Sequence, residues 1–71
     1  MAFNYQKLKG RITEILGTQK NFADTLGISA VSLSRKLNNL ASFSQQEIEN
    51  AIDILDIPKS EISSYFFCTE S

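Results

Sequence analysis

The chain contains no histidine and only one cysteine, Cys68. Glycine-rich phosphate loops and metal-ligand spacings are also missing, so the sequence lacks the groups on which most nucleophilic, acid–base and metal-assisted catalysis depends. A lone cysteine forms no intrachain disulfide, which makes a reducing cytoplasm the natural setting. We therefore expect a protein that is not an enzyme and that uses no cofactor and no metal ion.

The sequence also has no long hydrophobic run. No stretch approaches the roughly 20 apolar residues that cross a bilayer, and no apolar segment of the signal-peptide type follows the early lysines. The basic residues do not line one side of a long amphipathic helix, so a membrane is not an expected partner. With 71 residues, the chain is expected to form one domain, 1–71, around a small core.

What the sequence does contain is helical periodicity. One apolar stripe with three- and four-residue spacing predicts a first helix: Tyr5, Leu8, Ile12, Ile15 and Leu16. Ser44 and Glu47 form a capping box that starts a fourth helix, and Pro58 suits the first turn of a fifth helix through Tyr65. Because no segment shows a strand pattern, the expected fold class is all-α, a compact five-helix domain.

The pattern of residues 19–38 predicts a helix-turn-helix. Two short helices cross at a steep angle when a small residue lies at their contact and the turn holds a residue that tolerates positive φ. Ala23 and Gly27 occupy those two positions. Thr18 is the expected N-cap of the first helix and Ser29 that of the second. The two helices are predicted at about 19–26 and 30–38, followed by a loop over 39–43.

With these motifs, the chain resembles the lambda-type Cro and CI repressors, also called the XRE family. The turn Leu26–Ser29 and the run Val31–Asn39 carry the resemblance, which extends over about residues 5–67. The segments Phe3–Ile12 and Ile62–Phe67 resemble small phage-encoded regulators of Gram-positive bacteria. The resemblance implies a lambda-repressor-like DNA-binding domain in the cytoplasm of a bacterial host. It also implies binding of double-stranded operator DNA as a homodimer, in the lysis–lysogeny switch of a phage.

The second helix of the predicted motif presents a candidate reading face. Its helical repeat points these side chains outward: Val31, Ser32, Arg35 and Asn38. Arg35 is the best candidate for base recognition, because a guanidinium bridges the O6 and N7 atoms of guanine. Val31 suits contact with a thymine methyl group. For each of these side chains the alternative interpretation is an ordinary solvated helix surface.

Other polar side chains are candidates for contacts to the DNA backbone. Gln19 matches the position that clamps a phosphate in the family, and Ser29 lies at the corresponding place on the next helix. At the far end of the reading helix, Lys36, Asn38 and Asn39 are placed to reach the phosphates. Together with the reading face, these residues form the predicted DNA-binding site.

Charge is unevenly distributed along the chain. Residues 1–43 carry six Lys and Arg against two Asp and Glu, whereas residues 44–71 carry one against six, for a net charge of −1. The basic half would approach DNA first. Strong DNA binders are usually basic overall, however, and Val31 and two serines stand where stronger readers carry longer polar side chains. Besides a Cro-type repressor, the sequence therefore supports an antirepressor or modulator that binds a phage repressor of the CI type.

A protein-interaction role requires an exposed apolar surface. Tyr65, Phe66 and Phe67 are consecutive, so they cannot all face one core from a helix. Ile54 lies beside the inward stripe of the fourth helix, and Val31 points outward. These five residues form the predicted partner interface, either for a homodimer or for a complex with the repressor. The alternative is that the C-terminal residues fold over the small core.

Overall fold

The computed structural model describes residues 3–69, which form five α-helices and one short 3₁₀ helix. They are α1 (Gln6–Leu16), α2 (Gln19–Leu26), α3 (Ala30–Leu37), α4 (Gln45–Ile54), the 3₁₀ helix η1 (Lys59–Glu61) and α5 (Ile62–Phe66). The prediction of a small all-helical domain with five helices is confirmed. In this region the only β-type pairing is an isolated antiparallel bridge between Phe3 and Thr69.

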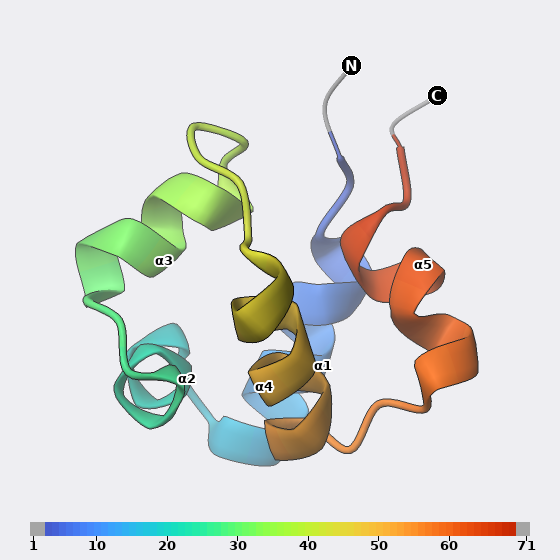
Figure 1. Cartoon of the computed structure of the whole chain (residues 1–71). Helices are drawn as coiled ribbons and strands as arrows, with labels where there is room; N and C mark the ends of the chain where they lie inside the picture. The colour runs from blue at the N-terminus through green and yellow to red at the C-terminus, as the bar shows by residue number, and fades with distance from the viewer. Residues whose placement is uncertain (1–2, 70–71) are drawn as a thin grey trace.

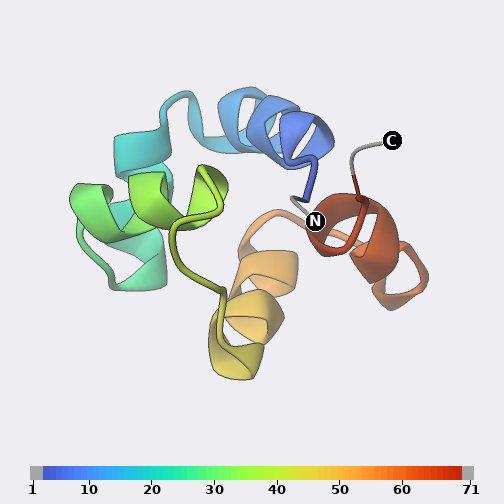
Figure 2. The same cartoon turned by 90° about the horizontal axis from the view of Figure 1, so that it is seen from above.

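The helices α3 and α5 lie on opposite sides of the domain, with α4 between them (Figure 1). The view from above shows the same separation, with α1 closing the structure along a third side (Figure 2). The segments before α1 and after α5 run side by side, because the Asn4 N–H donates a hydrogen bond to the Cys68 carbonyl. No helix within residues 3–69 is long and apolar enough to span a bilayer.

Side-chain caps fix where three of the helices begin. Thr18 and Ser29 each accept a hydrogen bond from the backbone N–H three residues later, at 3.1 and 3.0 Å. At the start of α4, Ser44 accepts from the Glu47 N–H at 3.1 Å, while the Glu47 carboxylate accepts from the Ser44 N–H at 2.8 Å. These bonds satisfy backbone donors that the helix itself leaves unpaired. The predicted N-caps and the capping box are therefore confirmed.

The turn between α2 and α3 depends on the conformation of Gly27. Its φ of 87° lies in the left-handed region, as predicted, and its N–H donates to the Ala23 carbonyl at 2.9 Å. A Cβ atom added at Gly27 would meet no other atom within 4 Å. The requirement for glycine here is therefore one of backbone conformation, and crowding plays no part.

One cluster of buried side chains forms the core, and α1 to α5 all contribute to it: Tyr5, Leu8, Ile12, Phe22, Ala23, Leu26, Leu33, Leu37, Ala51, Ile52, Leu55, Ile57 and Phe66. Two expectations about the helices were wrong in detail. Ile15, assigned to the buried stripe of α1, is exposed, although it lies within about 20° of the buried Leu8 around the helix; it stands in the last turn of α1, so its position along the helix, and not around it, leaves it exposed. Pro58 precedes η1 with a ψ of 142°, so the predicted fifth helix is divided into η1 and α5.

Arg11 fastens α1 to the end of α4. Its Nε donates to the Leu55 carbonyl at 2.9 Å and one terminal nitrogen donates to the Asp56 carbonyl at 3.3 Å. These are carbonyls that the last turn of a helix leaves without internal donors. The chain then leaves α4 through Asp56, whose φ of 53° is left-handed. Arg11 thus holds α4 in place between the two outer sides of the domain.

Candidate functional site

Two surfaces of the domain contain half of the predicted site residues. We call the first the α3 face, formed by Val31, Ser32, Arg35 and Asn38. The second, which we call the aromatic surface, is formed by Phe3, Phe43 and Phe67 together with the buried rings of Tyr5 and Phe66 that they contact. The α3 face comes from a single helix, whereas the aromatic surface comes from three separate parts of the chain.

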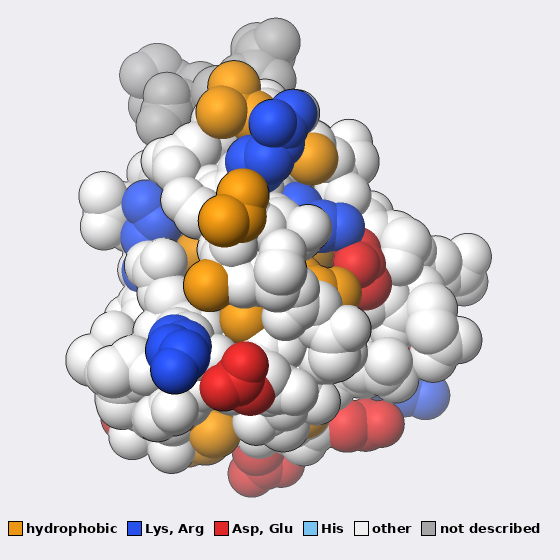
Figure 3. All heavy atoms as spheres, turned by 90° about the vertical axis from the view of Figure 1, so that its left-hand side faces the viewer, with side chains coloured by type: hydrophobic (Ala, Val, Ile, Leu, Met, Phe, Trp, Pro, Cys, Tyr) orange, Lys and Arg blue, Asp and Glu red, His pale blue; other side chains and the backbone are white. Residues whose placement is uncertain are grey.

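On the α3 face, the structure exposes the two residues with the clearest predicted roles. Val31 is 70% exposed, and Arg35 is exposed as well. Ser32 is half-buried, while the Asn38 amide donates to the Ser34 carbonyl at 2.9 Å. Figure 3 shows this side of the molecule, where hydrophobic patches are scattered among uncharged side chains, and where some blue groups lie beside red ones while the uppermost blue group has no red neighbour. Arg35 is therefore the one charged side chain of the α3 face.

Of the five residues predicted to contact phosphates, four have internal partners, Asn38 through the bond already described. The Lys36 amine donates to both carboxylate oxygens of Glu47, at 2.7 and 2.9 Å. The Asn39 amide binds the backbone of Phe3. Gln19 is exposed at the start of α2, and the Ser29 hydroxyl accepts the capping bond of α3. Contact of Lys36 or Asn39 with DNA stays a prediction. Such contact would require the ion pair of Lys36 with Glu47, or the bonds of Asn39 to Phe3, to break.

The ion pair between Lys36 and Glu47 ties α3 to α4 and is shielded from water. The side chains of Lys36 and Glu47 are only 14% and 18% exposed. Burial alone would raise the pKa of Glu47, but hydrogen bonds from Lys36 and from the Ser44 backbone outweigh it, so the pKa is lowered. The Lys36 amine also lies 6.0 Å from the centre of the Phe43 ring. Its charge is consequently neutralised inside the domain.

The aromatic surface is a continuous chain of ring contacts. Neighbouring rings lie 5.4 to 6.1 Å apart between centres, in the order Phe67, Phe3, Tyr5, Phe43 and Phe66. Three of the four contacts are edge-to-face, which is a favourable arrangement for aromatic rings. Burial raises the pKa of the Tyr5 hydroxyl. Phe67, at one end of the chain, is 50% exposed.

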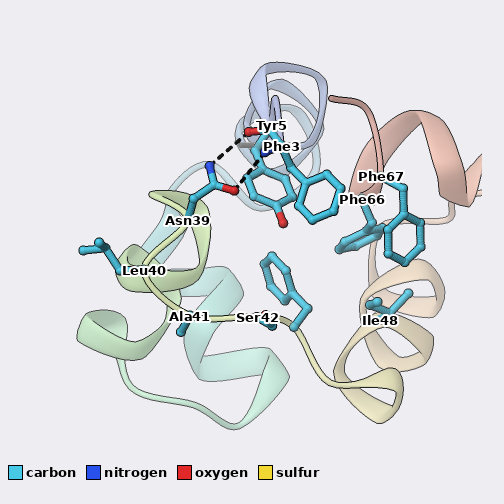
Figure 4. Close-up of a pocket in the computed structure, with 10 residues that line it drawn as sticks. Phe3, Tyr5, Asn39, Leu40, Ala41, Ser42, Ile48, Phe66 and Phe67 are labelled. Carbon is cyan, nitrogen blue, oxygen red and sulfur yellow. Dashed lines mark hydrogen bonds between the residues drawn. The ribbon is translucent and has the colours of Figure 1, made fainter. Parts of the chain in front are cut away.

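A hollow of about 380 Å³ lies beside these rings and is bordered by the loop after α3 (Figure 4). A second hollow adjoins it on the side of α4 and α5, and shares Phe43, Ile48 and Phe67 with the first. Glu49 lines the second hollow. Of the two hollows, only the second is lined by an acidic residue, and most of the lining of the first comes from residues 3–43.

The structure separates the residues of the predicted partner interface. Phe67 is open to a partner, but Phe66 is only 1% exposed and belongs to the core, so its predicted contact is wrong. Adjacent residues on a short helix point in different directions, and Phe66 takes the inward one. Ile54 is half-buried, and Tyr65 is half-buried with the Lys7 amine 4.7 Å from its ring centre. Val31 lies apart from them on the α3 face.

Sequence reasoning missed the part that Phe3, Tyr5, Phe43 and Asn39 play in the aromatic surface. These residues come from the N-terminal segment and from the loop after α3, and the bond between Phe3 and Asn39 joins positions 36 residues apart. No local spacing reveals such a contact. The one available signal was Asn39 itself, because asparagine after a helix often takes the left-handed conformation, and its φ is 62°.

Residues 1–69 match a protein family described as "Protein of unknown function (DUF739)", and the chain belongs to this family. Among solved structures, it is similar to the solution structure of the modulator of repression (MOR) of the temperate bacteriophage TP901-1 from Lactococcus lactis. The two chains share 40% sequence identity with a TM-score of 0.82, over 94% of this chain and 90% of the other. No curated protein matches the chain.

Proposed function

We propose that this protein regulates a phage genetic switch as a modulator of repression, by forming a complex with a partner repressor. The observation that carries the proposal is the aromatic surface, where the half-exposed Phe67 lies beside two hollows, the second of them lined by Glu49. The 40% identity with a phage modulator of repression supports the same function. The modulator hypothesis thus takes precedence over the Cro-type hypothesis that the sequence placed first.

The charge distribution suits a repressor as the partner. A repressor must neutralise DNA phosphates, so its DNA-facing surface is basic. Two acidic side chains of α4, Glu49 and Asp53, are exposed, and Glu49 lines the second hollow, so they complement such a surface electrostatically. The aromatic rings supply the apolar contact area from which most binding energy comes. A repressor held in this way has its DNA-facing surface covered, and releases its operator.

A second candidate function is direct binding of operator DNA by a lambda-repressor-like helix-turn-helix. Arg35 favours it: among residues 3–69, its guanidinium is exposed and makes no hydrogen bond or ion pair. In this function α3 enters the major groove of DNA and Arg35 reads a guanine. The net charge of −1 and the internal pairing of Lys36 predict that such binding is weak without a partner.

The two functions are separated by mixing the full chain with the repressor encoded in the same phage genome. We expect a complex in gel filtration, and release of the repressor from operator DNA in a gel-shift assay. Complex formation should tolerate added salt because apolar contacts dominate it, whereas phosphate contacts weaken steeply as salt rises. Tight, sequence-selective DNA binding by this chain alone, without a complex, would contradict the modulator function and establish the second candidate.

A further inference from the structure

Asn39 occupies a position between the α3 face and the aromatic surface. It follows the last turn of α3, where the Asn39 N–H donates to the Lys36 carbonyl at 3.2 Å. With a φ of 62°, the backbone is left-handed at this residue, and this conformation turns the chain out of the helix axis. The Asn39 side chain consequently points toward the N-terminal segment, as Figure 4 shows.

The Asn39 amide group binds both backbone groups of one residue. Its oxygen accepts from the Phe3 N–H at 2.9 Å, and its nitrogen donates to the Phe3 carbonyl at 3.0 Å. A backbone strand would satisfy Phe3 in the same way, so the side chain acts as a one-residue strand partner. On its other edge, the N-terminal segment is held by the bridge to Thr69 and by the Asn4 bond to Cys68.

The residue held between these two edges carries a ring that links two parts of the aromatic surface. The Phe3 ring lies 6.1 Å from the Tyr5 ring and 5.9 Å from the exposed Phe67 ring, measured between centres. If the backbone of Phe3 detaches, Phe67 loses its neighbour in the ring chain. The position of the aromatic surface therefore depends on a side chain from the end of α3.

We propose that Asn39 is a latch: its amide fixes the N-terminal segment and so couples the end of α3 to the aromatic surface. Asn39 acts as a positioning residue, because it need not touch a partner itself. A contact that displaces the end of α3 breaks the bonds of Asn39 and frees the Phe3 backbone. Conversely, a partner bound at the aromatic surface holds Phe3 in place, and so stabilises the latch and the end of α3. Such linkage works equally in both directions. The part that concerns the repressor rests on the function proposed above.

The test uses the full chain with the substitution Asn39→Gly, which keeps the left-handed backbone without strain and removes the amide. The informative probe is the Asn4 N–H, since its acceptor is the Cys68 carbonyl and the substitution does not remove that bond directly. We expect solvent exchange of this N–H, measured by NMR, to quicken by about five-fold, the effect of losing roughly one net hydrogen bond. The ring resonances of Phe3 and Phe67 should shift with it.

The matched control is Asp56→Gly. Asp56 has a similar φ of 53° and is exposed, so this variant reproduces the change in backbone freedom without touching the latch. It should leave the Asn4 exchange rate and both ring resonances as they are in the parent chain. A further variant, Asn39→Asp, keeps the acceptor for the Phe3 N–H but loses the donor, and should fall between the parent chain and Asn39→Gly.

A second measurement connects the latch to binding. In gel filtration or calorimetry with the repressor of the same phage, Asn39→Gly should weaken the complex about five-fold. Unchanged Asn4 exchange and ring resonances in Asn39→Gly would overturn the latch. Faster exchange with unchanged repressor affinity would overturn its coupling to binding. If the parent chain binds no repressor, the proposed function fails, and the exchange data still decide whether the latch exists.

Discussion

The α3 face and the aromatic surface are built in different ways. The side chains of the α3 face come from one helix, and the Asn38 amide donates to the Ser34 carbonyl of the same helix. The aromatic surface needs the N-terminal segment, the loop before α4 and the end of α5 to come together. The α3 face should therefore form wherever α3 forms, whereas the aromatic surface exists only when the whole domain is folded.

The two faces also differ in what they offer a partner. The α3 face exposes one free guanidinium and one isolated apolar side chain, and the nearby Lys36 is already neutralised by Glu47. The aromatic surface offers linked rings and two adjoining hollows. Electrostatic steering attracts DNA to the α3 face only weakly. Burial of apolar area favours the binding of a protein at the aromatic surface. The following variants test this difference, from the largest expected effect to the smallest.

Replacing Phe66 with alanine should unfold or severely destabilise the domain. Its side chain is 1% exposed and packs edge-to-face on Phe43, so its removal leaves a cavity that costs about 3–5 kcal/mol of unfolding free energy. Urea denaturation measures the loss. The neighbouring Phe67→Ala should cost under about 0.5 kcal/mol, as substitutions of surface residues usually do. Equal losses for the two variants would show that Phe67 belongs to the core and is not part of a docking surface.

Gly27→Val should lower the unfolding free energy by at least about 1 kcal/mol, because a β-branched residue is strained at positive φ. Since a Cβ meets no neighbour at this position, Gly27→Asn should be milder, as asparagine tolerates the left-handed region. Thermal unfolding of the three chains gives the comparison. A valine variant as stable as the parent chain would mean that Gly27 does not adopt the conformation described.

Lys36→Met should cost about 1 kcal/mol at neutral pH, because it leaves the half-buried Glu47 carboxylate without its cation. The pKa of Glu47 is lowered in the folded chain. The stabilisation is thus complete above the carboxyl pKa of the unfolded chain and is lost as pH falls through the folded value. Urea unfolding at roughly pH 7 and pH 3 should show the difference between parent and variant shrinking at the lower pH. A difference that stays constant would exclude the ion pair as its cause.

Arg35→Ala should have the smallest effect on stability, under about 0.5 kcal/mol, because this exposed side chain supports nothing else in the domain. Its effect, if α3 enters a major groove, is on DNA binding alone. Gel shifts over a series of base substitutions should then show relaxed choice at one guanine position. Equal weakening on every sequence would make Arg35 a phosphate contact, and no weakening would remove it from the reading face.

The features that could be predicted from the sequence depend on residues that lie close together along the chain. The capping box of α4, the hydroxyl caps of α2 and α3, and the left-handed Gly27 all depend on contacts between near neighbours. Local chemistry is sufficient for such features. The helix boundaries in the segment 19–38 accordingly came within one residue of those found, with α3 ending at Leu37.

The features that sequence could not predict join distant positions. Arg11 meets the Leu55 carbonyl across 44 residues, and Asn39 meets Phe3 across 36. Periodicity also failed to tell Phe66 from Phe67, because α5 is only five residues long and sets no clear inward face. For the candidate site, sequence named the α3 face and the exposed Phe67, but the partners that make Phe67 part of a surface become known only from the fold.

The most direct test compares two exposed apolar residues, one on each face. Phe67→Ser and Val31→Ser both remove a surface hydrophobic side chain, 50% and 70% exposed in the parent chain. Binding of the full chain to the repressor of the same phage is measured by calorimetry for both. Phe67→Ser should weaken the complex by about 2 kcal/mol, or roughly 30-fold, as a central aromatic contact does, and Val31→Ser should leave it nearly unchanged. The opposite result would place the docking site on the α3 face and contradict the role proposed for the aromatic surface.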